Sequence, residues 1–160
     1  MRFSVLLGVT ACFVLAPSAY AQLAPEWKFC NGEMLGTSDV RLTNCTALIQ
    51  SRREGAGDKA IAYNNRGIAY RSLGNPARAI EDYRRALALD QTYRDAYNNL
   101  GLALSDLGEF AAAVHAYTQA ITIDARDWHA YNNRGLALWA LGRREDARRD
   151  YEKVKELIGG

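Results

Sequence analysis

Apolar and small residues recur with a helical period over the last hundred residues, and a Leu-Gly pair interrupts them at regular intervals. Tyr63, Gly67 and Tyr70 fall at positions i, i+4 and i+7, which places them on one face of a helix. The Leu-Gly pair at 73–74 ends that helix, because glycine readily adopts the left-handed conformation of a helix end. Pro76 then suits the first turn of a second helix. The pattern predicts a helical hairpin whose second helix buries Ala79, Tyr83 and Ala86.

This hairpin occurs three times. Sliding the sequence along itself by 34 residues aligns segments 60–93, 94–127 and 128–160. Ten columns are identical in all three copies, which chance does not produce. Three such hairpins stack into a solenoid with a concave and a convex face. The identical columns are those of Ala62, Tyr63, Asn64, Asn65, Gly67, Ala69, Leu73, Gly74, Ala79 and Tyr83.

The glycines inside the first helices predict a close packing contact. Gly67, Gly101 and Gly135 share one register, and each costs about 1 kcal/mol relative to alanine in a helix. Three repetitions of that cost imply a close approach of the partner helix. We expect Ala79, Ala113 and Ala147 to be the matching contacts. The tyrosines should fill the core between hairpins, namely Tyr63, Tyr83, Tyr97, Tyr117, Tyr131 and Tyr151.

The repeated pattern resembles the tetratricopeptide (TPR) family, in which an aromatic residue, a small residue and a Leu-Gly turn precede Ala, Tyr and Ala in the second helix. The resemblance covers residues 60–160. Departures are modest. Gln91 and Ala125 replace the usual closing proline, Val154 replaces alanine, and Arg66 and Arg134 stand where the family often has leucine. The resemblance implies a non-catalytic module that binds protein.

The segment 22–59 precedes the repeats. Residues 22–37 read as a loop, and Ser38-Asp39 is an N-cap for a helix running to about Gln50. Cys45 aligns with Ala79, so we expect a lone second helix of a degenerate repeat that caps the solenoid. The stretch Cys-Thr-Ala-Leu-Ile resembles the segment before the repeats in small exported TPR proteins of alphaproteobacteria. The predicted fold class is therefore all-α: a right-handed α-solenoid of three TPR hairpins preceded by a capping helix.

The first 21 residues predict a cleavable signal peptide. Arg2 provides a positive start, residues 5–16 are almost wholly apolar, and Ala-Tyr-Ala precedes Gln22. Such a run is too short to span a bilayer comfortably, which takes about 20 residues. We expect an exported protein, most consistent with a bacterial periplasm, and no membrane span after cleavage. A lipoprotein anchored through Cys12 and a retained membrane anchor are the minor alternatives.

Cleavage would leave two cysteines. Cys30 and Cys45 form an even pair, and in an oxidising compartment such a pair is a disulfide candidate. Free thiols remain an alternative. No CxxC motif or Cys/His cluster has metal-ligand spacing, so no metal site and no cofactor are expected.

Composition and charge exclude several function classes. The chain has 49% hydrophobic residues, 24% charged residues and a net charge of +2, which does not predict the basic surface of a nucleic-acid-binding protein. His115 and His129 have no partner at ligand spacing, and no GxSxG, Walker or GxGxxG motif occurs. We therefore expect no enzyme.

The first helices should line the concave face and bind an extended peptide. The resemblance implies that the second asparagine of each pair points into this groove, where an amide can donate and accept hydrogen bonds. The asparagines could instead tie one repeat to the next, and Trp139 could be a packing residue. The groove set is Asn65, Asn99, Asn133, Ile68, Leu102, Leu136, Trp139, His129, Asp95, Asp106 and Arg71.

Two functions of different classes remain open at this point. The first is an adapter that holds an unidentified protein or peptide in the groove. The second is a structural subunit that self-associates through its last helix, about Arg144 to Ile158, because Val154, Leu157 and Ile158 have no helix after them. A homodimer is the corresponding hypothesis.

Overall fold

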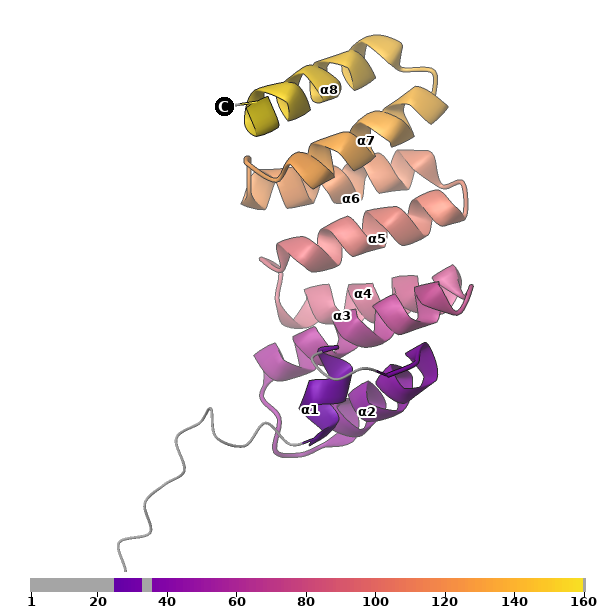
Figure 1. Cartoon of the computed structure of the whole chain (residues 1–160), viewed down its shortest axis with the longest axis vertical. Helices are drawn as coiled ribbons and strands as arrows, with labels where there is room; N and C mark the ends of the chain where they lie inside the picture. Colours follow the sequence, from indigo (N-terminus) through magenta and orange to yellow (C-terminus); the bar gives the residue numbers. More distant parts are fainter. Residues whose placement is uncertain (1–24, 33–35, 160) are drawn as a thin grey trace, which may run out of the picture.

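The structure, a computed structural model, describes residues 25–32 and 36–159, and these form a single-file stack of eight α-helices without a strand (Figure 1). The all-α solenoid predicted from the repeats is confirmed. The predicted signal peptide, the cleavage point at Gln22 and Cys12 lie outside the described residues. The helices are α1 Pro25–Cys30, α2 Ser38–Gln50, α3 Ala56–Ser72, α4 Pro76–Leu89, α5 Arg94–Asp106, α6 Phe110–Ile123, α7 Trp128–Ala140 and α8 Arg144–Gly159.

The three hairpins α3–α4, α5–α6 and α7–α8 close through the predicted Leu-Gly turns. Gly74, Gly108 and Gly142 have φ of 73°, 76° and 76°, the left-handed region that favours glycine. Pro76 begins α4, and the side chain of Asn75 caps it by accepting from the backbone N–H of Arg78. The turns therefore follow directly from the local sequence.

The helix contacts identify the concave side of the stack. Helices α3 and α5 approach each other directly, as do α5 and α7. Within residues 25–32 and 36–159, no comparable approach joins α4 to α6 or α6 to α8. The first helices of the hairpins are thus closer together than the second helices. It follows that α3, α5 and α7 line the concave face, and α4, α6 and α8 form the convex face.

The glycine repeated inside each first helix makes room for a tyrosine ring. A Cβ on Gly67 would lie 2.6, 2.9 and 3.0 Å from ring carbons of Tyr83, and Gly101 and Gly135 face Tyr117 and Tyr151 in the same way. The predicted close approach exists, but the expectation that alanines such as Ala79 provide the contact is wrong. The alanine side chain ends at its Cβ, whereas the tyrosine ring reaches across to the facing helix backbone.

The six tyrosines predicted for the core are buried to different degrees. Tyr83 and Tyr117 are fully buried, at 0% and 1% exposed. The other four are half-buried, and Tyr63, Tyr97 and Tyr131 pack against the core clusters between hairpins, as expected. Tyr151 is on α8, the last helix of the described stack, which packs on α7 alone within that stack.

The hydroxyl of Tyr83 offers a test of this core. In the described part of the chain its Oη is buried without a hydrogen-bond partner, and burial raises the pKa of this phenol above its ordinary value. A buried donor without a partner destabilises the fold. We expect Tyr83→Phe to leave the free energy of unfolding in urea unchanged or to raise it by up to about 1 kcal/mol.

The matched control is Tyr117→Phe. The Oη of Tyr117 lies 3.4 Å from Oγ of Ser105, so this variant loses a polar contact that Tyr83 lacks. We expect it to destabilise by about 0.5 to 1 kcal/mol. A larger loss of stability in Tyr83→Phe than in Tyr117→Phe would contradict this account.

The N-terminal segment differs from the sequence prediction. Residues 25–30 form helix α1, which packs on α2, so the loop predicted for 22–37 and the lone capping helix are wrong there. Trp27 and Cys30 are buried against Cys45 and Leu48. The predicted α2 is present, with Thr37 rather than Ser38 as its N-cap.

A disulfide holds these two helices together. Cys30 and Cys45 are bonded, with their Cα atoms 4.9 Å apart, and both are buried. Closing a loop of this length stabilises a fold by about 3 kcal/mol. The bond therefore fixes α1, which has only 6 residues and too few backbone hydrogen bonds to be stable alone.

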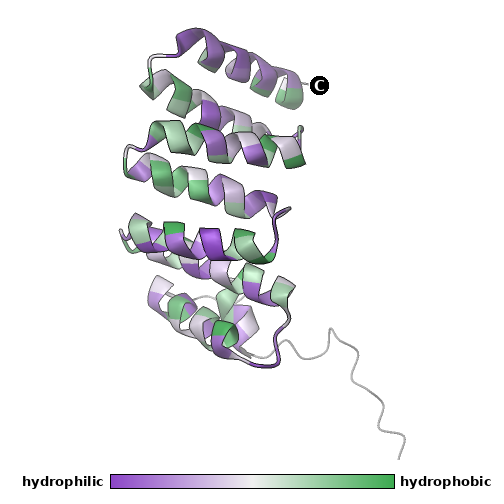
Figure 2. Ribbon diagram, turned by 180° about the vertical axis from the view of Figure 1, so that it is seen from behind, coloured by the Kyte–Doolittle hydropathy of each residue, from purple (hydrophilic) through white to green (hydrophobic). Residues whose placement is uncertain are grey.

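Helix α8 provides its own polar outer surface at the other end of the stack, as its mostly hydrophilic colouring shows (Figure 2). Arg148 pairs with Glu145 and Glu152, and Lys153 pairs with Glu156. Val154 and Leu157 are half-buried, which leaves Ile158 at 61% exposed. The last helix therefore has a polar outer face, and self-association through it stays a prediction. No helix in the described ranges is long and apolar enough to cross a membrane.

Candidate functional site

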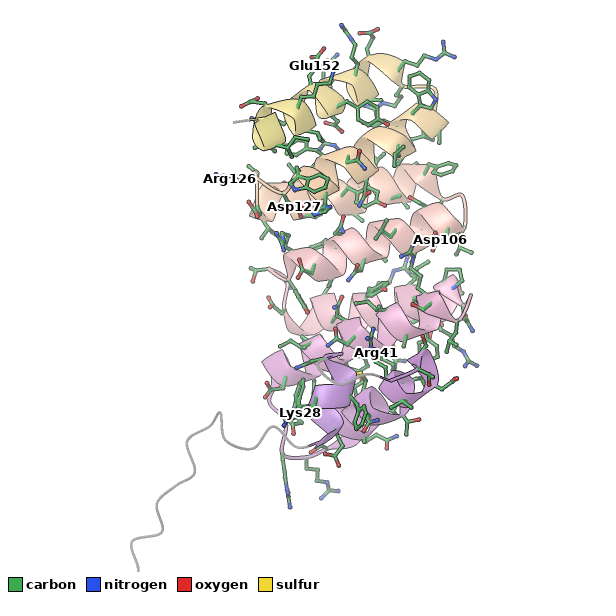
Figure 3. All side chains as sticks on the ribbon, in the orientation of Figure 1. Lys28, Arg41, Asp106, Arg126, Asp127 and Glu152 are labelled. Carbon is green, nitrogen blue, oxygen red and sulfur yellow. A yellow bond between two sulfur atoms is a disulfide. The ribbon has the colours of Figure 1, made fainter. Side chains whose placement is uncertain are left out.

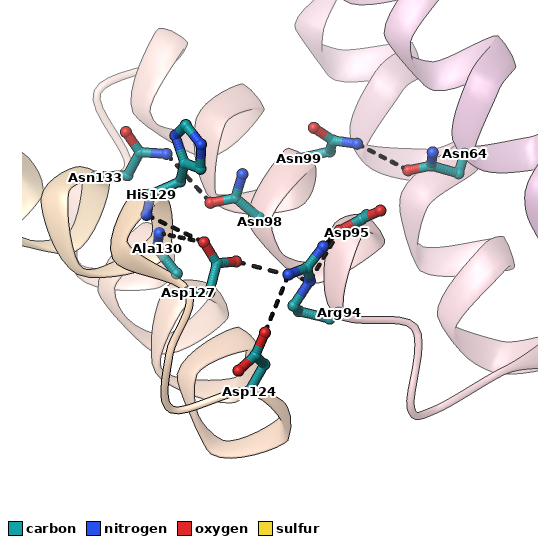
Figure 4. Close-up of polar contacts among 10 residues, drawn as sticks. All are labelled: Asn64, Arg94, Asp95, Asn98, Asn99, Asp124, Asp127, His129, Ala130 and Asn133. Carbon is teal, nitrogen blue, oxygen red and sulfur yellow. Dashed lines mark hydrogen bonds and ion pairs between the residues drawn. The ribbon is translucent and has the colours of Figure 1, made fainter. Parts of the chain in front are cut away.

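The second asparagine of each pair lies on the first helix of its hairpin and bonds to the preceding part of the stack, as Figure 4 shows for Asn99 and Asn133. The side-chain N–H of Asn99 donates to Oδ1 of Asn64 at 2.9 Å, and that of Asn133 donates to Oδ1 of Asn98 at 3.1 Å. Asn65 donates to Oδ1 of Asn31 at 3.1 Å. Asn99 and Asn133 thus join successive repeats, and Asn65 joins the first repeat to the segment before it. This is the alternative role that the sequence left open.

This bonding leaves each amide with capacity for a ligand. A primary amide has two N–H donors and an acceptor oxygen, and the bond to the preceding repeat uses one N–H. Asn65, Asn99 and Asn133 are half-buried rather than buried. Their role in peptide binding remains a prediction, and the inter-repeat bonds hold them at regular intervals along the concave face.

The apolar residues of the groove set lie about one turn or more beyond the asparagines on the first helices, and their exposure differs from repeat to repeat. Ile68 and Leu102 are half-buried against the central core cluster. Leu136 is 57% exposed, and Trp139 is 56% exposed with the Arg144 guanidinium 5.4 Å from its ring centroid. The concave face is therefore most open to an apolar ligand at the third repeat.

The charged side chains of the predicted groove set form ion pairs, either with a residue of the neighbouring repeat or with an adjacent residue in the chain. Arg71 donates from Nε to Oδ2 of Asp106 at 2.6 Å, and Asp106 lies at the end of α5 (Figure 3). The Asp106 carboxylate raises the pKa of Arg71 above its ordinary value. Asp95 pairs with Arg94, which also reaches Asp124 at 3.2 Å. These side chains brace the stack, and a ligand would have to compete for them.

His129 lies at the start of α7, in the region of the Arg94–Asp124 ion pair (Figure 4). Its ring stacks on Trp128 with centroids 3.6 Å apart, and both side chains are exposed. Asp127 caps the helix by accepting from the backbone N–H of His129 and Ala130. No group of three metal-ligating side chains occurs among residues 25–32 and 36–159. His115 lies on α6, away from His129.

Two ion pairs that each join a partly buried arginine to a buried aspartate were missed by the sequence reasoning. Arg66 donates to both carboxylate oxygens of Asp82, at 2.7 and 2.8 Å, and Arg134 does the same to Asp150, at 2.8 and 2.7 Å. The Asp82 carboxylate raises the pKa of Arg66. The signal was present, because each arginine precedes its aspartate by 16 residues and the middle repeat has neither.

Family models match most of the repeat region. The model described as "Tetratricopeptide repeat" matches residues 60–93 and, in a second version, residues 129–158. A model described as "TPR repeat" matches residues 101–142. A search of the curated proteins found no match.

Several solved structures are similar to this chain. A crystal structure of MamA has 29% sequence identity and a TM-score of 0.68, over 75% of this chain and 68% of that one. The chain spans 63% of a second MamA structure. The second TPR domain of human RPAP3, solved with the HSP70 peptide SGPTIEEVD, has 32% identity and a TM-score of 0.64, over 66% of this chain and 88% of that one.

Proposed function

The chain belongs to the tetratricopeptide repeat family, and from that premise we propose that it is a non-catalytic adapter which holds an extended peptide or protein surface along its concave face. A similar chain, the second TPR domain of human RPAP3, was solved with a bound peptide. The observation that carries the proposal is the open apolar end of the groove, where Leu136 and Trp139 are more than half exposed on α7, the helix that also carries Asn133.

The groove favours recognition of a peptide along its length rather than by its terminal carboxylate. The resemblance to TPR domains that grip a C-terminal carboxylate implies lysines, an arginine and asparagines at five groove positions. Here these positions carry Asn64, Ile68, Asn99, His129 and Asn133, and only Asn99 fits. Asn99 is already bonded to Asn64. Regularly spaced amides suit an extended backbone, and exposed aromatic and leucine side chains suit an apolar anchor.

We also propose that the protein works outside the reducing cytoplasm. The buried disulfide between Cys30 and Cys45 supports this location, because such bonds persist in oxidising compartments. The sequence of the first 21 residues predicts an export signal. A periplasmic partner protein is the corresponding expectation.

The test uses peptides selected from a random display library against the full, oxidised chain. We expect the double variant Leu136→Ser/Trp139→Ser to weaken binding of a selected peptide at least about tenfold, because each side chain would lose a buried apolar contact. Both side chains are exposed in the free protein, so the variant should keep its helical circular dichroism.

The matched control is Leu89→Ser/Ile123→Ser. These two residues are 42% and 40% exposed and lie at the ends of α4 and α6, outside the groove. We expect it to bind within about twofold of the parent. Equal loss in both double variants, or none in the groove variant, would refute the proposed site.

A further inference from the structure

A groove on the convex side repeats along the stack with two different linings. In the third repeat it lies between α6, α7 and α8 and encloses about 280 Å³. Its walls are strongly charged and its charges are paired, because Arg134 binds Asp150 and Arg143 and Arg149 both bind Asp146.

The same groove one repeat earlier is apolar. A cavity of about 270 Å³ lies between α4, α5 and α6, and six of its seven lining residues stand 34 positions before lining residues of the charged groove. Leu100 replaces Arg134, Ala116 replaces Asp150 and Ala112 replaces Asp146. The ion pairs that occupy the charged groove thus have no counterpart here. The lining is Arg84, Tyr97, Leu100, Leu104, Ala112, His115 and Ala116.

The surface around this cavity is neutral along α6 and mainly basic along α4. Helix α6 has no Asp, Glu, Lys or Arg in its 14 residues. On α4, the exposed charged residues are Arg78, Arg84, Arg85 and one acid, Glu81. None of these four forms an ion pair within residues 25–32 and 36–159. An acidic ligand therefore meets arginines at the rim without having to displace a carboxylate.

This cavity is separate from the concave groove. Tyr97, Leu100 and Leu104 line the cavity, whereas Asn99, Leu102 and Asp106 of the concave set each stand two residues further along α5. Two residues correspond to a rotation of about 200° around a helix. The two sets therefore lie on opposite sides of α5, and binding at one can be measured without the other.

We propose that this convex cavity is a second docking site, which takes a protein segment with one large apolar side chain beside an acidic residue. The apolar side chain occupies the space lined by Leu100, Leu104 and Ala116, and the carboxylate pairs with Arg84 at the rim. The cavity is smaller than the roughly 300 to 1,000 Å³ of small-molecule sites, so a single side chain suits it. The proposal does not depend on the concave groove.

The test is a titration of the ¹⁵N-labelled full chain with the synthetic peptide acetyl-Gly-Ser-Glu-Leu-Glu-Ser-Gly-amide, followed by amide chemical shifts. We expect saturable shifts at residues of α4, α5 and α6 that line the cavity. Replacing the leucine of the peptide by serine should weaken binding about tenfold or more, because a buried leucine side chain is lost.

Two variants on α6 separate the cavity from its surroundings. Ala112 lines the cavity and Ala111 does not, although both are exposed. The third repeat carries Asp146 and Glu145 at these registers, so the fold accepts acidic residues there. We expect Ala112→Glu to weaken the peptide at least about tenfold and Ala111→Glu to leave it within about twofold.

A charge exchange tests the rim. We expect Arg84→Glu to lose the acidic peptide and to bind a peptide in which both glutamates are lysines, whereas Arg85→Glu, outside the lining, should keep the parent preference. Shifts confined to the concave residues of α3, α5 and α7, equal effects at positions 111 and 112, or no saturable binding would overturn the proposal.

Discussion

Replacing Gly101 by alanine is expected to lower the free energy of unfolding by about 2 to 3 kcal/mol, although alanine is the better helix former by about 1 kcal/mol. A Cβ at this position would lie 2.5 Å from Cε1 of Tyr117 and 2.7 Å from Cδ1 and Cζ. The ring cannot move aside, because Tyr117 is 1% exposed and packs against Leu104 and Tyr83 in the central core cluster. Urea unfolding followed by circular dichroism measures the loss.

Alanine substitutions at two other glycines should change the free energy of unfolding by different amounts, according to the space around each glycine. A Cβ at Gly135 would meet Cε1 of Tyr151 at 2.8 Å, and Tyr151 is half-buried on the last helix and free to shift. We expect Gly135→Ala to cost about 1 kcal/mol. A Cβ at Gly57 meets nothing within 4 Å, so Gly57→Ala should gain about 0.5 kcal/mol. A Gly101→Ala chain as stable as the parent would contradict the packing account.

The register of these glycines shows what the repeats allow one to predict. Residues that are identical in all three aligned repeats mark positions with a shared structural role, so the close approach of two helices at Gly101 was predictable. The partner was not, because the spacing predicts Ala113 and Tyr117 equally well as residues of the facing helix. Only the length of the tyrosine side chain, placed in three dimensions, selects Tyr117.

Helix α1 was not predictable for a different reason. Six residues give less than two helical turns, too few for a period of 3.6 to emerge from the sequence. Its stability comes from contacts distant in the chain. Trp27 packs against Leu48 and Ala62, its Nε1–H donates to Glu54 at 3.3 Å, and the disulfide joins Cys30 to α2.

For the asparagine ladder, the series Asn65, Asn99 and Asn133, the sequence left two roles open, namely peptide binding and bonding between repeats. The structure relates these two roles. The side chain of Asn99 points from its repeat to Asn64 of the preceding one, so it stabilises the stack. The same bond fixes its orientation on the concave face. Asn31, which stands 34 residues before Asn65, extends the ladder into the segment before the repeats.

The Arg-Asp pairs distinguish otherwise similar repeats. The first and third repeats bury an arginine and an aspartate where the second has Leu100 and Ala116. The same backbone arrangement thus accommodates either an Arg–Asp ion pair or a leucine and an alanine. This equivalence explains why the convex groove is apolar in the middle repeat and charged in the third, and it predicts how the ion pairs respond to mutation.

Arg66→Leu is expected to destabilise the protein by about 3 to 5 kcal/mol, because it leaves Asp82 buried without its cation. The Asp82 side chain is 3% exposed, and both of its oxygens accept from Arg66. The double variant Arg66→Leu/Asp82→Ala recreates the pair that the middle repeat already has. We expect it to lose less than about 1.5 kcal/mol, since replacing a whole buried ion pair by apolar residues is often nearly neutral.

The comparison of single and double variants separates charge pairing from packing. If the double variant is much more stable than Arg66→Leu, the loss in the single variant came from the unpaired carboxylate rather than from the missing arginine contacts. Arg66 also donates to Thr46 at 3.2 Å and lies over the ring of Tyr63. If these contacts held the first repeat together, the double variant would be as unstable as the single one. Urea unfolding of both variants beside Asp82→Ala decides between the two outcomes.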